Sequence, residues 1–286
     1  MLWRLLIWRL PMLGGLIVGS CAPQTLPRPA AHITYAVGAP YQDGGVWRYP
    51  AERFGGTETG LAIRHAGARL ATDGEVWDDT QMLVSHPTLQ TPAIVRVTNL
   101  DTGMTITARV IDRGPPGRGR VAGLSDRAAV ALGLGERPIP VRVDVDGARS
   151  QALRDRLHPG QTGLIAAPSA AVQQETLPGA PGALRAVAII SKDAPAGETP
   201  LPDGAEAGPR SPGQIWLRAG TFDGADAARL QAGRLAAIAP RIERAGTGRA
   251  ETYTVRAGPF ADAAAADTAL DQAVLAGVTD VRIVVE

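Results

Sequence analysis

The C-terminal part of the chain contains an internal repeat, and no other feature of the sequence restricts the fold as tightly. Residues 217–222, Leu-Arg-Ala-Gly-Thr-Phe, recur 38 residues later as 255–260, Val-Arg-Ala-Gly-Pro-Phe. Each copy ends a predicted strand and precedes an alanine-rich amphipathic segment, at 225–238 and 261–276, and a last strand is predicted at 281–285. Two such βαβ halves build a small antiparallel sheet of four strands with both helices on one face, a ferredoxin-like α+β arrangement. The other face is then free for a ligand.

A second constraint is the predicted strand from Thr105 to Ile111, where β-branched and small residues alternate. Asp112 follows directly, and Gly114 with two prolines then breaks the ladder. A carboxylate at a strand end sits on rigid backbone and faces the opening of the fold, so it can carry a proton near neutral pH. An ordinary turn, in which the aspartate bonds the next backbone amides, accounts for the same residues.

The residues around this strand predict a small β-barrel. Further short strands are predicted at 61–64, 81–85, 94–99 and 141–145. Ser125 is suited to cap one helix, Asp126 favours its positive end, and Gly133 stops it. A barrel of six strands with one or two short helices accounts for this pattern.

Five ordered blocks lie along this part of the chain. They are 73–78 (Asp-Gly-Glu-Val-Trp-Asp), 85–89 (Ser-His-Pro-Thr-Leu), 95–100 (Val-Arg-Val-Thr-Asn-Leu), 111–115 (Ile-Asp-Arg-Gly-Pro) and 123–129 (Gly-Leu-Ser-Asp-Arg-Ala-Ala). The series resembles the double-psi β-barrel domain of the rare lipoprotein A (RlpA) family of bacterial septal lytic transglycosylases. The resemblance implies that residues 60–146 form an all-β double-psi β-barrel.

The resemblance also implies a reaction. In a lytic transglycosylase the C6 hydroxyl of an N-acetylmuramyl residue attacks its own anomeric carbon, so one carboxyl group serves as acid and then as base. The family's catalytic aspartate falls on Asp112 and its essential glutamate on Glu75. We expect Asp112 to act as general acid and base, and Glu75 to stabilise positive charge or to tune the proton affinity of Asp112. Without the resemblance, they are a turn aspartate and a solvated turn glutamate.

His86 is the third catalytic candidate, because it follows Glu75 by the same spacing as the family's histidine. It would bond one of the two carboxylates or a sugar hydroxyl, and a structural histidine at a strand end is the alternative. Three further candidates for glycan binding are Arg113 for charge, Asn99 for sugar hydrogen bonds and Trp77 for ring stacking. A structural role is the alternative for each of them.

The chain departs from the family where the barrel opens. The family has an Ala-Ser-Trp-Tyr-Gly segment followed by Phe-His-Gly, whereas residues 62–69 read Ala-Ile-Arg-His-Ala-Gly-Ala-Arg. The stacking aromatics are missing, and His65 is only a candidate for a replacement contact. Aromatic platforms supply much of sugar binding, so a barrel that binds glycan without cutting it is the alternative reading.

The repeat at the C-terminus resembles the sporulation-related repeat (SPOR) domain, which binds peptidoglycan strands stripped of their stem peptides. The resemblance covers residues 214–286. It implies that the sheet face holds sugar through Trp216, Arg218, Tyr253 and Arg256. Turn and core roles for the glycines and phenylalanines of the repeat are compatible with this function.

The N-terminus is typical of an exported protein. Residues 1–20 combine an arginine-bearing start with a short apolar run, which predicts a signal peptide, and Cys21, the only cysteine, follows. The segment resembles a bacterial lipoprotein signal in which Cys21 is acylated, and with Ala22 next it implies the outer membrane, facing the periplasm. An unmodified thiol is the alternative. Residues 21–59 read as a tether and lead-in, whose aromatics pack on the barrel or stack on glycan.

The composition of the chain argues against several other classes of protein function. A net charge of +1 and the absence of a basic run argue against nucleic acid as a partner. The four histidines and single cysteine offer no ligand cluster at metal spacing, so we expect no metal and no cofactor. Residues 147–213 are rich in proline, alanine and glycine and read as a flexible linker, in which one or two helical turns are predicted at 151–158 and a short strand at 186–191.

These observations together predict an endolytic transglycosylase anchored in the outer membrane and enriched at the division septum. Its substrate would be glycan strands lacking stem peptides, and the C-terminal domain would deliver the barrel to the septum. Division proteins at the septum are candidate partners that the sequence does not specify. A glycan-binding lipoprotein without activity is the rival hypothesis, and a hydrolase on the same barrel, releasing reducing ends, is a third.

Overall fold

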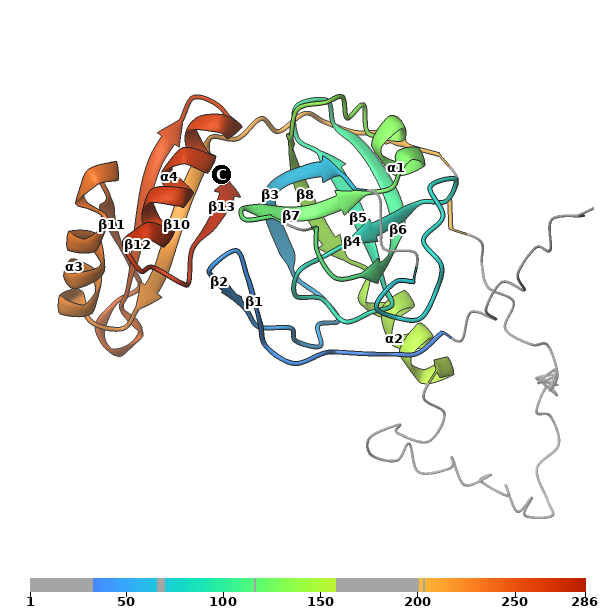
Figure 1. The fold of residues 1–286 in the computed structure, drawn as a ribbon, viewed down its shortest axis with the longest axis horizontal. Helices are drawn as coiled ribbons and strands as arrows, with labels where there is room; N and C mark the ends of the chain where they lie inside the picture. The colour runs from blue at the N-terminus through green and yellow to red at the C-terminus, as the bar shows by residue number, and fades with distance from the viewer. Residues whose placement is uncertain (1–32, 66–69, 116, 158–200, 203) are drawn as a thin grey trace, which may run out of the picture. The chain divides into compact units, whose positions relative to one another are not determined.

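The computed structural model describes residues 33–65, 70–115, 117–157, 201–202 and 204–286. They form a β-barrel domain and a C-terminal α+β domain, coloured from blue to green and from orange to red in Figure 1. The predicted signal peptide, Cys21 and the predicted short strand at 186–191 lie outside the described residues. Within the described ranges, no helix is long and apolar enough to cross a membrane.

Six strands close into a barrel. They are β3 (Thr57–Arg64), β4 (Leu83–Ser85), β5 (Ala93–Asn99), β6 (Met104–Asp112), β7 (Arg120–Leu124) and β8 (Ile139–Val145). Neighbouring strands follow the order β4-β7-β3-β8-β5-β6, and a pairing of β4 with β6 closes the ring. The pairings β3–β7 and β4–β6 are parallel and the others are antiparallel. The predicted barrel is confirmed.

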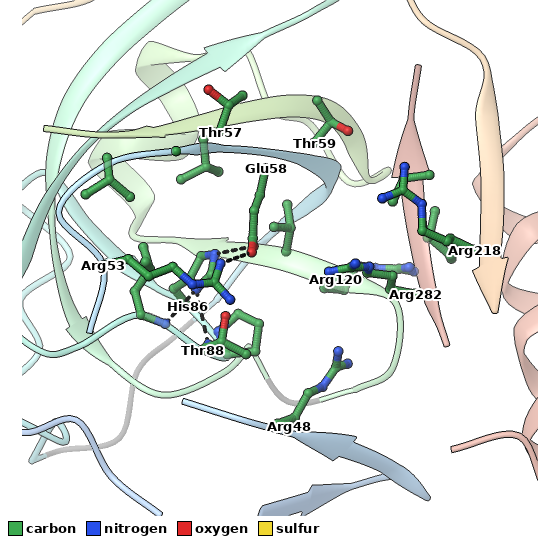
Figure 2. Close-up of a pocket in the computed structure, with 18 of the residues that line it drawn as sticks. Arg48, Arg53, Thr57, Glu58, Thr59, His86, Thr88, Arg120, Arg218 and Arg282 are labelled. Atoms are coloured by element: carbon green, nitrogen blue, oxygen red, sulfur yellow. Dashed lines mark hydrogen bonds and ion pairs between the residues drawn. The ribbon is translucent and has the colours of Figure 1, made fainter. Parts of the chain in front are cut away.

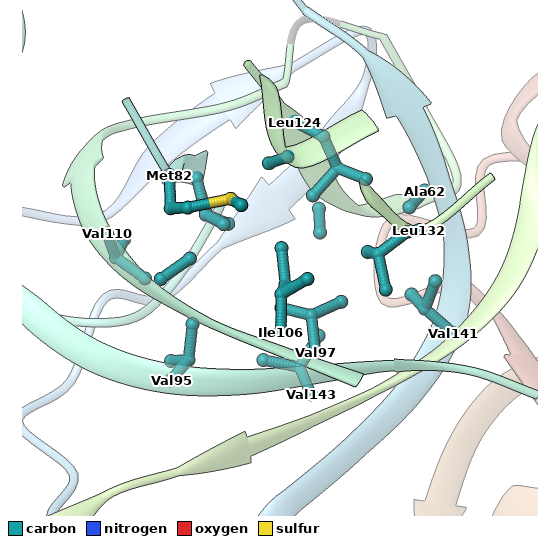
Figure 3. Packing of buried hydrophobic residues seen from close by; sticks show 14 of the residues in the cluster. Ala62, Met82, Val95, Val97, Ile106, Val110, Leu124, Leu132, Val141 and Val143 are labelled. Carbon is teal, nitrogen blue, oxygen red and sulfur yellow. The ribbon is translucent and has the colours of Figure 1, made fainter. Parts of the chain in front are cut away.

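The barrel is filled by aliphatic side chains from every strand. Figure 3 shows Val95, Val97, Ile106, Val141 and Val143 converging on the interior, and each is at most 2% exposed. The same view shows Leu124 above them and Leu132 beside Val141, and both leucines are fully buried. Each such side chain stabilises the fold by about 1.5–3 kcal/mol on burial. Packing of this kind can hold the domain together without a disulfide.

Strand β7 was not among the predicted strands, because it starts at an arginine and contains a glycine. Gly123 has a steric function there: a Cβ atom at this position would lie 2.4 Å from Oγ of Ser85 and 2.7 Å from Cβ of His65. Strand β7 pairs with β3 on one side and β4 on the other. The missing side chain therefore lets three segments meet at the end of the barrel that carries Asp112.

Two helices flank the barrel. Helix α1 (Asp126–Ala131) begins as predicted, with Oγ of Ser125 accepting from the amide nitrogen of Ala128 over 3.3 Å. Helix α2 (Gly147–Leu157) is longer than the one or two turns predicted within the spacer. Oγ of Ser150 in this helix accepts from the amide nitrogen of Ile94 over 2.9 Å, which ties α2 to β5. Further along the chain, β9 (Glu206–Ala207) pairs with the start of β6.

The aromatic lead-in forms a hairpin of β1 (Tyr41–Asp43) and β2 (Val46–Arg48). The hydroxyl of Tyr41 donates to the carbonyl of Pro87 over 3.0 Å, which joins the hairpin to the barrel. The rings of Trp47 and Tyr49 stack on each other at 6.3 Å and remain 42% and 60% exposed. One aromatic thus packs on the barrel as expected, and two stay available at the surface.

The C-terminal domain has a four-stranded antiparallel sheet in the order β11-β12-β10-β13. Its strands are β10 (Ile215–Phe222), β11 (Arg241–Ala245), β12 (Thr252–Phe260) and β13 (Arg282–Val285), and its helices are α3 (Ala225–Arg234) and α4 (Ala263–Leu275), with 3-10 turns at η1 (Ala236–Ile238) and η2 (Gly248–Ala250). Leu217 and Val255, from the central strands, are fully buried in one cluster with Ala228 of α3 and Leu270 of α4. Both helices therefore cover the same face, as the repeat predicts.

The repeated glycines have equivalent backbone conformations. Gly220 and Gly258 both adopt positive φ, at +97° and +124°, which side-chain-bearing residues rarely do. The pairing of β10 with β12 shifts register between Arg218 and Thr221, beside Gly220. The repeated glycine therefore has a conformational function in both copies.

Candidate functional site

One loop places Glu75 beside β6, the strand that ends at Asp112. The loop runs from Ala71 to Glu75 and contacts the strand along its last residues. The amide and hydroxyl of Thr72 both bond the Asp112 side chain, and the amide of Asp73 donates to the carbonyl of Ile111 over 3.2 Å. The Glu75 carboxylate forms an ion pair with Arg109 of the same strand. Asp112 and Glu75 thus belong to one local assembly.

The Asp112 carboxyl group is held through one oxygen. Its Oδ1 accepts from the amide of Thr72 over 3.0 Å, from the hydroxyl of Thr72 over 2.7 Å and from the amide of Arg113 over 2.8 Å. No described residue donates to its Oδ2. The residue is 7% exposed. A carboxyl group with one anchored and one open oxygen suits a proton donor, because the anchored oxygen fixes the direction of the open one.

Glu75 shares its surroundings with a third carboxyl group that the sequence reasoning did not single out. Asp73 is fully buried, and its Oδ1 accepts from the amide of Glu75 over 2.9 Å. Burial raises the pKa of Asp73 to about 7; the bond from the Glu75 amide and the charge of Arg109 lower it in part, while the Glu75 carboxylate raises it further. Asp73 can therefore hold a proton near neutral pH beside Glu75.

His86 is fixed in place by its neighbours and does not face the two carboxylates. Its Nδ1 accepts from the amides of Thr88 and Leu89, over 3.2 and 3.1 Å. Its Nε2 lies 3.2 Å from Oε2 of Glu58, and the residue is 1% exposed. The backbone amide of His86 donates to the carbonyl of Asp112 over 3.0 Å. Within the described part of the chain, His86 thus reaches Asp112 through its backbone.

Figure 2 shows the carboxylate of Glu58 between Arg53 and His86. Burial alone would raise the pKa of Glu58, but the close contacts of its carboxylate with His86 and Arg53 outweigh burial and lower the pKa to about 2. These three residues line a pocket together with other barrel residues, among them Arg48, Thr57, Thr59 and Thr88. Neither Asp112 nor Glu75 lines this pocket. Glu58 and Arg53 were not identified from the sequence, since neither belongs to a recognisable motif.

The three remaining candidates in the barrel are engaged internally. The Asn99 amide donates to the carbonyl of Leu132 over 2.8 Å, and its Oδ1 accepts from the amide of Asp101 over 3.0 Å. Trp77 is 9% exposed, and its indole N–H donates to Oδ1 of Asp79 over 2.8 Å. The Arg113 guanidinium donates to the carbonyls of Leu89 and Val37. These contacts favour the structural role that the sequence left open for each residue.

The helix-free face of the C-terminal sheet carries three of its four predicted glycan-binding residues. Trp216 and Arg218 alternate with the buried Leu217, and Arg256 alternates with the buried Val255, so all three point away from the helices. The Arg256 guanidinium lies 3.8 Å from the centre of the Trp216 ring, a cation–π contact.

Tyr253 lies on the other side of this sheet. It is two residues from Val255 in an unbroken stretch of β12, and it packs against the core cluster beneath the helices. The Glu251 carboxylate, which accepts a hydrogen bond from the tyrosine hydroxyl, raises the pKa of Tyr253. The expectation that Tyr253 shares a face with Arg256 is therefore not met, because strand alternation separates them.

The sequence is similar to several proteins named endolytic peptidoglycan transglycosylase RlpA. The protein of that name from Pseudomonas aeruginosa (strain UCBPP-PA14) is 33% identical over 240 residues, which cover 77% of this chain and 67% of the relative. The chain belongs to the RlpA family. RlpA of Escherichia coli (strain K12) is 40% identical over 101 residues, covering 33% of this chain and 28% of that protein.

The RlpA of Vibrio cholerae is 40% identical over 83 residues, which cover 28% of this chain and 32% of that protein. The chain thus spans less than a third of the length of the Escherichia coli and Vibrio cholerae relatives. The family model of the SPOR domain matches residues 211–283. The predicted membership of the RlpA family and the predicted SPOR domain are confirmed.

This RlpA family member differs at the segment that opens the barrel. The imidazole of His65 meets the Trp77 ring edge-on, with 5.6 Å between the ring centres. Burial lowers the pKa of His65, and the nearby Asp112 carboxylate acts in the opposite direction. His65 therefore stands beside both the catalytic candidate Asp112 and the indole. Residues 66–69, which complete the segment, lie outside the described residues.

Proposed function

We propose that the chain is an endolytic lytic transglycosylase, a carbon–oxygen lyase that cleaves peptide-free peptidoglycan strands to 1,6-anhydromuramyl ends. The names of the relatives support this activity. The observation that carries it is the anchoring of Asp112 and Glu75 to the same end of β6 by the loop from Ala71 to Glu75. Asp112 ends a rigid strand, and the ion pair with Arg109 ties Glu75 to the same strand, which gives the pair of carboxyl groups that glycosidic cleavage commonly uses.

Asp112 acts first as the acid. A proton on its open oxygen, Oδ2, passes to the bridging oxygen of the glycosidic bond as the bond to the anomeric carbon breaks. The C6 hydroxyl of the same muramyl residue then attacks the anomeric carbon, and its proton passes to the Asp112 carboxylate. The enzyme returns to its starting state without water. The Glu75 carboxylate either stabilises the oxocarbenium-like transition state or tunes the proton affinity of Asp112.

His86 and Arg109 act through other residues in this scheme. The backbone amide of His86 bonds the carbonyl of Asp112, and its ring is fixed by Glu58 and two amides. The Arg109 guanidinium holds one oxygen of Glu75. Both residues orient a carboxyl group, which is a positioning function.

The SPOR domain binds the glycan strand and concentrates the barrel on its substrate in this proposal. Acylation of Cys21 anchors the protein in the outer membrane on its periplasmic side. Peptide-free strands arise where stem peptides have been removed, as at the division septum, so substrate and enzyme meet there. Separation of daughter cells is the process that this activity would serve.

Sacculi treated with an amidase to remove stem peptides provide the test. The purified protein should release soluble fragments whose masses correspond to anhydro ends, and the Asp112→Asn variant should sediment with sacculi without releasing them. Fragments with reducing ends would instead indicate a hydrolase.

A non-catalytic glycan-binding protein is the second candidate. The observation in its favour is the loss of stacking aromatics from the opening segment, together with the burial of Asp112 to 7% exposure. This candidate predicts that the unmodified protein sediments with the sacculi and releases nothing, under conditions where an active relative releases anhydro fragments.

A further inference from the structure

Four arginines form one row across the SPOR sheet. Arg218 of β10 pairs with Arg256 of β12 and with Arg282 of β13, and Arg256 pairs on its other side with Arg241 of β11. Directly paired residues of neighbouring strands point to the same side of a sheet. The row therefore crosses all four strands on the helix-free face, and it spans about 14 Å at the usual strand spacing of about 4.8 Å.

Like charges placed directly opposite each other destabilise a sheet, so this row needs compensation. The inner pair receives it: the Glu286 carboxylate bridges Arg218 and Arg256, and Glu243 adds a second ion pair to Arg256 at 2.8 Å. The outer residues, Arg241 and Arg282, form no ion pair with any described carboxylate. Four cations thus share two carboxylates, and the excess charge is at the two ends of the row.

The centre of the row is rigid and partly apolar. The Arg256 guanidinium rests on the Trp216 ring at 3.8 Å, and Arg256 is 13% exposed at its side chain. The outer arginines Arg241 and Arg282 are exposed. A flat indole and guanidinium surface with a free cation at either end suits a ligand that alternates apolar sugar faces with negative charges.

We propose that this row binds the lactyl carboxylates of successive muramyl residues in a peptide-free glycan strand. The inference rests on the proposed function, in which the SPOR domain binds such strands. In intact peptidoglycan the lactyl carboxyl group is consumed in an amide bond to the stem peptide, and removal of the peptide frees it as a carboxylate. Guanidinium groups bind carboxylates through paired N–H donors, so the freed group is a direct ligand for Arg241 and Arg282.

Neutralising the carboxylate without shortening the glycan tests the proposal. Strands released by amidase digestion are compared with the same strands after carbodiimide coupling to methylamine, which converts each lactyl carboxylate to a neutral amide. Binding of the full chain is measured by calorimetry for both forms. We expect the methylamide form to bind about tenfold more weakly, because the solvent-exposed ion pairs at Arg241 and Arg282 are both lost.

Variants of the arginines test whether the row causes this difference in affinity. Arg241→Gln combined with Arg282→Gln should bind both strand forms with the weaker affinity. Arg229→Gln is the matched control, because Arg229 belongs to helix α3 on the covered side and is 69% exposed at its side chain. It should keep the tenfold difference. Circular dichroism checks that the double variant is folded.

Each other outcome overturns the inference. Equal binding of both forms by the unmodified protein would leave glycan binding intact and exclude recognition of the carboxylate. If the double variant still bound the methylamide form more weakly than the carboxylate form, the arginine row would not be the part of the protein that recognises the carboxylate. Binding of neither form would contradict the proposed function itself.

Discussion

The amide of Glu75 donates to Oδ1 of Asp73 over 2.9 Å, while Oδ2 of Asp73 and Oε1 of Glu75 are both buried and have no hydrogen-bond partner among the residues that the structure describes. Two carboxylates cannot bond to each other unless one of them carries a proton. A proton on Asp73 would satisfy both buried oxygens at once. This proton agrees with the upward shift of the Asp73 pKa, which burial and the charge of Glu75 raise to about 7.

The first prediction concerns the pH dependence of stability. Asp73 keeps its proton to about pH 7 when folded but loses it near its ordinary pKa of 3.8 when unfolded. Between these values the folded state binds more protons, so stability falls as the pH rises. Asp73→Asn should remove a decline of up to about 4 kcal/mol across this window. Urea unfolding at pH 5 and pH 8 should capture about 3 kcal/mol of this decline, because about two of its three pH units lie in that interval.

Asp101→Asn is the matched control, since Asp101 is an exposed turn residue. It should leave the pH profile of the parent protein unchanged. If Asp73→Asn gave the same pH profile as the unmodified protein, Asp73 would not hold its proton at neutral pH.

The second prediction has the opposite sign and concerns Glu58. Its folded pKa of about 2 lies below the ordinary value of 4.5, so its contribution is complete above pH 4.5 and disappears as the pH falls toward 2. Glu58→Gln should lower the free energy of unfolding by about 3 kcal/mol at most at pH 7, and this loss should shrink as the pH is lowered to 3. Glu136→Gln, on the exposed surface, is the control. A loss of stability that does not change with pH would contradict the lowered pKa of Glu58.

The third prediction separates the acid from the residue that orients it. Asp112→Asn should reduce anhydro-product release by 10² to 10⁴-fold, the usual contribution of a general acid. Thr72→Val removes the hydroxyl that lies 2.7 Å from Oδ1 of Asp112, and we expect a loss of about tenfold. Initial rates of product release give both values. Thr102→Val, at an exposed turn, should retain the parent rate. Equal rates for Thr72→Val and the parent would exclude this positioning role.

The fourth prediction tests the steric function of Gly123. A Cβ atom there would collide with Ser85 and His65, so Gly123→Ala should destabilise the barrel by about 1–3 kcal/mol, as overpacking does. Gly135→Ala is the comparison, since nothing lies within 4 Å of the added atom. Chemical denaturation gives both values. Equal stability of the two variants would show that β7 shifts freely to make room.

Local sequence patterns were sufficient to predict most of the helices and strands. Alternation predicts β5 and β6 nearly to the residue, because both strands are lined by the core and tolerate few polar residues. The serine cap marks the start of α1, and the repeated Arg-Ala-Gly segment locates β10 and β12. Strand β7 was not predicted, since its glycine is required by contacts with Ser85 and His65, which lie far away in the sequence.

The motif blocks in the sequence determined the family, the two domain types and the positions of Asp112 and Glu75, because motif residues keep their order and spacing along the chain. Only the tertiary structure decided which side chains meet. It joined Asp73 to Glu75 and turned the His86 ring toward Glu58. It also aligned Arg218 and Arg256 with Arg241 and Arg282. Pairing register and burial set those contacts, and both depend on residues far apart in the chain.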